Sequence, residues 1–276
     1  CSRPERFLPR FPHMRDPDLK LIRSRENSRF KALRQLATST RERRKAGLAL
    51  LDGMHLISAY RASGGVPEQL ILSESGAANA EAARLAGGVA AQQVLLLADA
   101  LFNEIAQVAT PTGIVALIHT PQAGPLPEKI GDCVMLENIQ DAGNLGSILR
   151  STAAAGIFTV LLSQGCAFAW SPKVLRAGMG AHFGLDLYDD VDLRAAVARL
   201  SGRLICTSGQ AETSLYQADL RGPLAWAFGN EGSGLSAALG AAAAGQVRIP
   251  MPGGAESLNV AAAAAICLFE QVRQRG

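Results

Sequence analysis

The amino-acid sequence predicts an α/β protein with a small N-terminal domain and a larger C-terminal domain built on a mostly parallel sheet. First, strand-length apolar runs alternate with helical patterns along most of the 276 residues. Second, the strand-length runs of the C-terminal half are apolar almost throughout, which is typical of parallel strands with helices on both faces. Third, three prolines within residues 121–127 interrupt regular structure and separate the two halves.

The N-terminal domain is expected over residues 20–119. Phe30, Leu33 and Leu36 repeat at helical spacing, and the charged residues that follow are expected to form a loop. That loop spans residues 41–45, further strands are expected at 48–51, 69–72, 94–97 and 113–118, and further helices at 55–61, 77–85 and 102–108. The opening residues hold several prolines and no apolar stretch long enough for a signal peptide, so residues 1–19 are interpreted as a tag or a disordered arm.

The C-terminal domain is expected over residues 131–276, after a linker at residues 120–130. Its strands are expected at residues 133–136, 158–162, 204–206, 224–228 and 247–249, with helical patterns between them. The last helix is expected to carry one continuous apolar face, because its apolar residues recur at helical spacing. This face consists of Leu258, Ala261, Ala262, Ala265, Phe269 and Val272.

Composition excludes several classes of protein. The longest uninterrupted apolar run, Val260 to Phe269, is about half of the ~20 residues that a membrane-spanning helix needs, so no membrane partner is expected. The five cysteines lie far apart in the sequence and form no CxxC pair. We therefore expect neither a disulfide framework nor a metal site, and we infer a cytoplasmic protein.

Charge is distributed unevenly along the chain. Residues 1–61 hold 15 Lys or Arg and 6 Asp or Glu, a balance of +9, whereas the remainder holds 12 and 18, a balance of −6. A basic N-terminal part on an acidic body suggests a polyanionic partner. Charge alone fits an ordinary solvated basic helix equally well.

Three loops that follow expected strands combine glycine with side-chain amides and a carboxylate. They span residues 137–150, 229–236 and 250–259. Ligands of open parallel sheets bind at the carboxyl ends of the strands, and glycine lets the backbone approach a ligand closely. Each loop taken alone could be an ordinary turn or helix cap, but three on successive strand ends favour a small-molecule pocket.

The common nucleotide and hydrolase motifs are absent from the sequence. It contains no GxxxxGK[ST], no GxGxxG, no HExxH and no GxSxG. These absences disfavour ATP, NAD, metal-dependent hydrolysis and acyl transfer.

The three loops resemble the signature motifs of the SpoU/TrmH-type RNA ribose 2′-O-methyltransferases, which belong to the α/β-knot (SPOUT) superfamily. The matching residues are Asn138, Asp141, Asn144, Gly146 and Arg150, then Gly229, Glu231 and Gly234, then Ile249, Pro250, Met251, Ser257, Leu258, Asn259 and Val260. Residues 171–181 also look familial, although members often have serine where this chain has Gly178. The N-terminal domain is similar, more loosely, to a ribosomal-protein-like substrate-binding domain, through residues 24–27, the basic stretch to Lys45 and Asp52-Gly53.

The resemblance implies S-adenosylmethionine as the methyl donor and a deep trefoil knot formed by the second and third loops and the last helix. It also implies a homodimer whose active site is completed by the partner subunit. The implied cofactor contacts are Gly229, Ile249, Met251 and Leu258, and the implied catalytic residues are Asn144, Arg150, Glu231, Ser257 and Asn259. Because a guanidinium is effectively always protonated, we expect Arg150 to clamp a phosphate and stabilise charge on the oxygen rather than act as the base.

The implied substrate is RNA, and the low aromatic content of 5% disfavours a stacking platform for single strands, which favours structured RNA. Candidate phosphate contacts are Arg25, Arg29, Lys31, Arg34, Arg41, Arg43, Arg44 and Lys45. Family members with such an N-terminal domain often act on ribosomal RNA, which we therefore expect as the partner. A tRNA ribose methyltransferase, a non-catalytic RNA-binding or ribosome-assembly factor, and an enzyme that methylates a base nitrogen remain alternatives.

Overall fold

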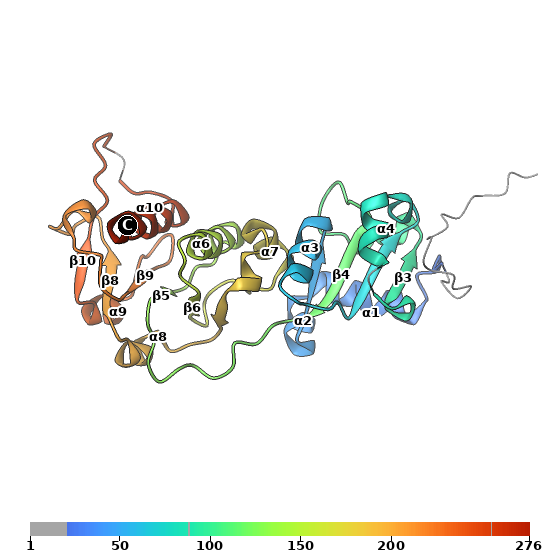
Figure 1. Cartoon of the computed structure of the whole chain (residues 1–276), viewed down its shortest axis with the longest axis horizontal. Helices are drawn as coiled ribbons and strands as arrows, with labels where there is room; N and C mark the ends of the chain where they lie inside the picture. The colour runs from blue at the N-terminus through green and yellow to red at the C-terminus, as the bar shows by residue number, and fades with distance from the viewer. Residues whose placement is uncertain (1–20, 88, 255) are drawn as a thin grey trace, which may run out of the picture. The chain divides into compact units, whose positions relative to one another are not determined.

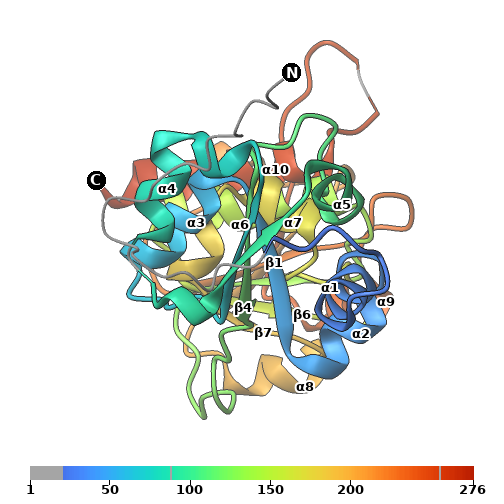
Figure 2. The same cartoon turned by 90° about the vertical axis from the view of Figure 1, so that its right-hand side faces the viewer.

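The computed structural model describes residues 21–87, 89–254 and 256–276 (Figures 1 and 2). The chain divides into two compact units between Thr120 and Pro121. The arm expected at residues 1–19 lies outside the described residues. Leu126 packs against the core of the second unit and Ile130 forms a parallel bridge with Leu200, so these residues of the expected linker belong to the second unit.

The first unit contains a four-stranded mixed sheet in the order β1-β4-β2-β3. The strands are β1 (Leu48–Asp52), β4 (Ile114–His119), β2 (Gln69–Ser73) and β3 (Val94–Leu97). β4 pairs antiparallel with β1 and β2, with Leu50 opposite Leu117, while β2 and β3 are parallel, with Ile71 opposite Leu95. All four expected strands of this unit are present.

Helices cover both faces of this sheet (Figure 1). One face packs against α1 (Ser28–Thr38) and α5 (Asp99–Ile105), whose Phe30, Leu33 and Phe102 are buried with Leu50 and Ile71. The helices of the other face are α3 (Met54–Ala62) and α4 (Ala80–Ala86), and short 3-10 turns occupy Gly76–Ala78 and Ala91–Gln93.

The loop expected at residues 41–45 is wrong, because these residues lie in helix α2 (Thr40–Ala46). Ser39 caps its first turn by accepting a hydrogen bond from the backbone N–H of Glu42, and Gly47 ends it in the left-handed conformation. A run of charged residues between two such caps is a good helix, since Arg, Glu and Lys have high helix propensity.

The second unit contains a six-stranded, all-parallel sheet in the order β10-β8-β9-β5-β6-β7. The strands are β5 (Cys133–Leu136), β6 (Thr159–Leu162), β7 (Asp186–Tyr188), β8 (Arg203–Thr207), β9 (Leu224–Phe228) and β10 (Gly245–Val247). The expected parallel sheet is confirmed. The sequence missed β7, a three-residue edge strand of which only Leu187 is buried.

Helices cover both faces of this sheet as well, which confirms the predicted fold class (Figure 1). On one face lie α6 (Ala142–Ala154), α7 (Pro172–Gly178) and α10 (Val260–Arg275), and on the other lie α8 (Leu193–Ala196) and α9 (Ala237–Ala242). Three 3-10 turns complete the described part of the unit, at Ala181–Gly184, Val197–Arg199 and Leu215–Gln217.

The last helix buries a different face from the apolar one seen in the sequence. Cys267, Leu268 and Gln271 are buried, and the indole N–H of Trp226 in β9 donates to Gln271 at 2.6 Å. Phe269 and Val272 of the apolar face remain 48% and 38% exposed. This helix is therefore held to the sheet by a mixed polar and apolar face, and the described part of the chain leaves Phe269 and Val272 of the predicted apolar face exposed.

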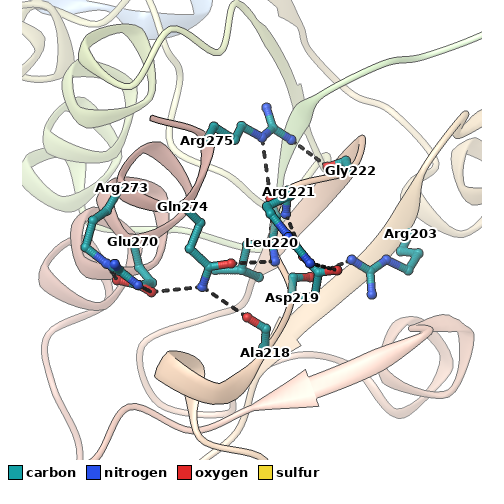
Figure 3. Close-up of polar contacts among 10 residues, drawn as sticks. All are labelled: Arg203, Ala218, Asp219, Leu220, Arg221, Gly222, Glu270, Arg273, Gln274 and Arg275. Carbon is teal, nitrogen blue, oxygen red and sulfur yellow. Dashed lines mark hydrogen bonds and ion pairs between the residues drawn. The ribbon is translucent and has the colours of Figure 1, made fainter.

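Polar contacts fix the end of α10 to residues 218–222, the segment that precedes β9 (Figure 3). The side chain of Gln274 accepts from the N–H of Leu220 at 2.9 Å and donates to the carbonyl of Ala218 at 3.0 Å. Arg275 donates to the carbonyl of Gly222 at 2.6 Å and pairs with Asp132. These contacts set the position of α10 and thus of Asn259 at its other end.

Candidate functional site

Side chains from the first turn of α6, from the loop after β9 and from the residue that caps α10 meet at the carboxyl edge of the second sheet. Asn144 donates through Nδ2 to Oε1 of Glu231 at 3.0 Å. Asn259 donates through Nδ2 to Oδ1 of Asn144 at 2.8 Å. The loops after β5, β9 and β10 therefore converge as expected, and one directed chain of hydrogen bonds joins them.

Each of the three residues is placed by local structure that the sequence specifies. Asp141 caps α6 by accepting from the N–H of Asn144 at 2.7 Å. Asn259 caps α10, because its Oδ1 accepts from the N–H groups of Ala261 and Ala262. With Oδ1 of Asn259 engaged in the cap, its amide NH₂ is left to donate to Asn144.

The Glu231 loop is folded tightly on itself. Oδ1 of Asn230 accepts from the N–H groups of Gly232 and Ser233, at 2.9 and 3.1 Å. A Cβ atom at Gly229 would lie 2.3 Å from the backbone carbon of Gly234, and Gly234 itself has a φ of +67°. Glycine is thus required at both positions by the turn.

The Glu231 carboxylate is held in its charged form. Burial alone would raise its pKa, but hydrogen bonds from the Asn144 side chain and from backbone N–H groups, including that of Asp141, lower the pKa below the ordinary value. A carboxylate with a lowered pKa is a poor proton acceptor at neutral pH. It is well suited to orient Asn144 and to place negative charge beside the adjoining pocket.

Two adjoining pockets open beside this hydrogen-bonded chain. The first has a volume of about 370 Å³ and includes Gly229, Glu231, Leu258 and Asn259 in its lining. The second, of about 140 Å³, includes Ile249, Met251 and Leu258. Thr207, Ser257, Leu258 and Ala263 line both pockets. All four expected cofactor contacts, and Ser257, therefore lie around one continuous site.

A fourth loop contributes to this site, and the sequence analysis missed it. Thr207, the last residue of β8, and Ser208 and Gly209, which follow it, line the smaller pocket. The available signal was Gly209, three residues after the strand expected at 204–206, at the same edge of the sheet as the other three loops.

Arg150 is not part of this cluster. It lies on α6, six residues after Asn144, and its side chain is exposed. Within residues 21–87, 89–254 and 256–276 it has no hydrogen bond or ion pair, and it lines neither pocket. The structure thus brings together four of the five expected catalytic residues and leaves the fifth free for another contact.

The basic residues of the first unit differ in their availability. Arg25 and Arg34 share the carboxylate of Glu104, at 2.6 and 3.3 Å, and Lys31 pairs with Glu26. Arg29, Arg41, Arg44 and Lys45 are exposed.

Arg43 is instead buried, at 5% exposure, and its guanidinium donates to the carbonyls of Leu36 and Ala37 at the end of α1. Burial lowers the pKa of this guanidinium. Because it closes the end of a helix inside the unit, we leave Arg43 out of the candidate phosphate contacts.

The described residues contain no cluster of His, Cys, Asp or Glu that could hold a metal ion. A search of the same part of the chain for a helix both long and apolar enough to cross a membrane also found none.

Comparison with known proteins gives matches for both units. The model of the SpoU rRNA Methylase family matches residues 132–269, and that of the MRM3-like substrate binding domain matches residues 27–116. The chain is 31% identical to the 23S rRNA (guanosine(2553)-2′-O)-methyltransferase RlmP of Bacillus subtilis, over 91% of this chain and 98% of that protein.

Solved structures agree with these matches. One is the crystal structure of an RNA 2′-O ribose methyltransferase, with a TM-score of 0.78, 32% identity and coverage of 93% of this chain and 99% of that one. Another is the SpoU methyltransferase AviRb from Streptomyces viridochromogenes in complex with the cofactor AdoMet, with a TM-score of 0.76, 27% identity and coverage of 90% and 99%.

Proposed function

Because the chain belongs to the SpoU rRNA Methylase family, we propose that it transfers a methyl group from S-adenosylmethionine to a ribose 2′-hydroxyl of ribosomal RNA. The observation that carries this proposal is the hydrogen-bonded chain Asn259–Asn144–Glu231 beside a two-part pocket. A ribosomal RNA substrate is met in the cytoplasm, which is the location that we propose.

The pocket fits the chemistry of S-adenosylmethionine, which supplies an activated methyl group when bound. Leu258, Ile249 and Met251 offer apolar walls to an adenine ring, and the glycine-bearing loops offer backbone groups to its polar edges. The ionised Glu231 places negative charge in the wall of the larger pocket, which favours a cationic sulfonium centre.

The residues of the chain would position the RNA and stabilise charge. Asn259 and Asn144 fix the geometry of the loops, so that the donors around the pocket are preorganised before RNA binds. Glu231 holds the Asn144 amide in one orientation. We assign Arg150 to the phosphate next to the reacting ribose, where its fixed positive charge would stabilise the developing oxyanion, while a phosphate oxygen or water accepts the proton.

We also propose that the protein acts as a homodimer. Leu258, Phe269 and Val272 leave an apolar face uncovered on the described subunit, at 38%, 48% and 38% exposure. Among the described residues, Arg150 makes no hydrogen bond or ion pair within its own subunit. Pairing of two copies through the α10 face would bury the apolar residues and bring Arg150 to the pocket of the partner subunit.

The deep trefoil knot stays a prediction, and the path of the chain supports it. β10 lies at one edge of the sheet, whereas α10, which follows it, packs against Trp226 in β9 and against α6. The chain therefore turns back over the sheet after its last strand.

For the first unit we propose contact with RNA phosphates through its exposed basic residues. Arg29, Arg41 and Lys45 are directly available. Arg25 and Arg34 would have to give up their ion pairs with the Glu104 carboxylate to bind a phosphate. Each therefore contributes less to the free energy of RNA binding than an unpaired arginine.

The test uses tritiated S-adenosylmethionine with separated rRNA and tRNA from a strain that lacks the gene. We expect label in rRNA and a 2′-O-methylated nucleoside on mass spectrometry of the digest. Label in tRNA would show that the substrate is tRNA, and a methylated base would show that the enzyme methylates a base nitrogen. Failure to bind the donor in calorimetry would indicate a non-catalytic RNA-binding factor.

Two variants test the site. Arg150→Ala is expected to abolish transfer while donor binding persists, and the exposed Lys173→Ala on α7 is the control. Mixing Arg150→Ala with Asn259→Ala subunits is expected to restore part of the activity, because one site of a mixed dimer then has both residues. No restoration would place Arg150 in the same subunit as its pocket.

A further inference from the structure

A third pocket lies on the same carboxyl edge of the second sheet and shares no lining residue with the two pockets described above. Its volume is about 620 Å³, and its lining comes from the loops after β5, β6 and β7 and from the start of α9. The lining residues that carry polar groups include Glu137, Asn138, Gln164, Asp192, Arg194 and Ser236. We refer to it as the flanking pocket.

Asn138 connects the flanking pocket to the reaction site. Its backbone carbonyl accepts from Nδ2 of Asn230 at 2.9 Å, and Asn230 lines the larger cofactor pocket. Its side chain lines the flanking pocket. The loop after β9 lines both pockets as well, through Gly234 and Leu235 in the larger cofactor pocket and through Ser236 in the flanking pocket.

The Asn138 side chain is held in a defined orientation. Its backbone has a φ of 57°, and Ser163 Oγ both accepts from its N–H at 2.9 Å and donates to its Oδ1 at 3.3 Å. A Cβ atom at Gly165 would lie 1.9 Å from that same Oδ1, so only glycine leaves room for the amide. The amide edge of Asn138 is thus fixed before any ligand binds.

Both carboxylates of the flanking pocket accept hydrogen bonds from groups of the protein itself. The carboxylate of Glu137 accepts from the N–H and hydroxyl of Ser236, at 2.7 and 2.8 Å. Asp192 accepts from the N–H of Ala195 at 3.0 Å, as the cap of α8. Arg194 is exposed, and in the described part of the chain it has no hydrogen bond or ion pair.

This set of groups matches one nucleotide. The amides of Asn138 and Gln164 can each donate and accept, which is what the edge of a nucleobase requires. One free guanidinium suits a single phosphate, whereas a polyphosphate would need several cations. Bases in single-stranded or splayed RNA are recognised in this way, on their hydrogen-bonding edges.

We propose that the flanking pocket binds the base of a nucleotide adjacent to the methylated one, with Arg194 on its phosphate. This inference rests on the proposed function, since it assumes that RNA lies across the neighbouring reaction site. It assigns to Gln164 and Arg194, which lie outside the three family motifs, a role in choosing which RNA sequence is methylated.

The first experiment measures phosphate contact. Binding of a fluorescein-labelled, single-stranded, mixed-sequence RNA of about twelve nucleotides is followed by anisotropy between about 50 and 200 mM KCl, for Arg194→Gln and for the exposed Lys129→Gln as control. We expect Arg194→Gln to weaken binding about fivefold and to lower the salt slope by about 0.7, and Lys129→Gln to change neither. Equal behaviour of the two variants would overturn the phosphate assignment.

The second experiment measures base recognition. The affinities of oligoA, oligoC and oligoU of the same length are compared for the wild type and for Gln164→Ala. We expect the wild type to prefer one base and Gln164→Ala to reduce that preference at least about threefold, as for loss of a base-edge contact. An unchanged preference in Gln164→Ala, or none in the wild type, would overturn the base assignment.

Calorimetry with S-adenosylmethionine separates the two proposals. If donor binding and methyl transfer are normal but Arg194→Gln and Gln164→Ala do not affect oligonucleotide binding, the proposal for the flanking pocket is refuted. The proposed methyltransferase function then still stands. If the protein does not bind the donor but Arg194→Gln loses affinity for the oligonucleotide, the proposal for the flanking pocket still stands. The proposed methyl transfer is then refuted.

Discussion

His182 should make the second unit less stable in mild acid. It lies in the 3-10 turn Ala181–Gly184 and is 1% exposed, with its ring centroid 5.4 Å from that of Trp170. Nε2 is 3.0 Å from the carbonyl oxygen of Ala169, which can only accept, so Nε2 carries the hydrogen. Nδ1 has no partner among the described residues, and a proton there would be buried without an acceptor.

The size of the effect follows from the pKa of this ring. Burial lowers the pKa of His182 to about 4, against 6.5 for an ordinary histidine, although the bond to Ala169 opposes the shift. A difference of about 2.5 units corresponds to roughly 3 kcal/mol. Because the folded-state pKa is the lower one, the unfolded chain binds the proton first. The contribution of the neutral His182 ring to the free energy of unfolding is therefore fully present above about pH 6.5 and is lost as the pH falls toward about 4.

Tryptophan fluorescence isolates this effect, because both tryptophans, Trp170 and Trp226, lie in the second unit. Urea unfolding is measured at several pH values for the wild type, His182→Gln and the exposed His119→Gln in the first unit. Between about pH 6.5 and 4 the wild type and His119→Gln should lose about 3 kcal/mol more than His182→Gln, which cannot titrate. Parallel losses in all three proteins would refute the reasoning.

Three further substitutions test the packing and the site. Gly146→Ala places a Cβ 2.5 Å from a backbone oxygen of α7 and should cost about 1–3 kcal/mol in urea unfolding, whereas Gly240→Ala in α9, whose Cβ would meet only Nε2 of Gln246 at an ordinary contact distance of 4.0 Å, should be neutral or stabilising. Arg43→Gln should destabilise the first unit by about 2 kcal/mol in thermal unfolding, because it strips donors from buried helix-end carbonyls, and the exposed Arg41→Gln should not. Asn259→Asp keeps the α10 cap but loses the donor to Asn144, so methyl transfer should fall at least about tenfold with little change in melting temperature. Wild-type transfer by that variant would show that the hydrogen-bonded chain is dispensable.

The convergence of three loops could be predicted because each loop is determined by short-range chemistry. Asp141 and Asn259 cap helices, and Gly229 and Gly234 permit a tight turn, so each segment carries its own geometry. The parallel sheet then brings the segments to one edge. Which amide bonds to which carboxylate depends on contacts across roughly a hundred residues, and no local pattern encodes that pairing.

The sequence analysis was wrong about Arg43 and missed β7 and the loop after β8, because the type of a residue does not reveal which elements will lie next to it. Arg43 belongs to a basic run, yet it is the one member whose guanidinium lies against the carbonyls that end α1. β7 has three residues at the sheet edge, too few for a periodic pattern. Thr207 and Gly209 look like ordinary loop residues until β8 is known to lie between β10 and β9.

In the last helix, the periodic pattern identified the apolar face correctly but did not predict what that face would pack against. The apolar stripe through Phe269 and Val272 exists, but Trp226 selects the face that contains Gln271, because a buried indole N–H needs an acceptor. A polar residue facing the sheet turns the apolar stripe outward. The same helix thereby fixes Asn259 in the site through its sheet-facing side and presents an apolar surface for the proposed second subunit, so the two roles depend on opposite faces of one element.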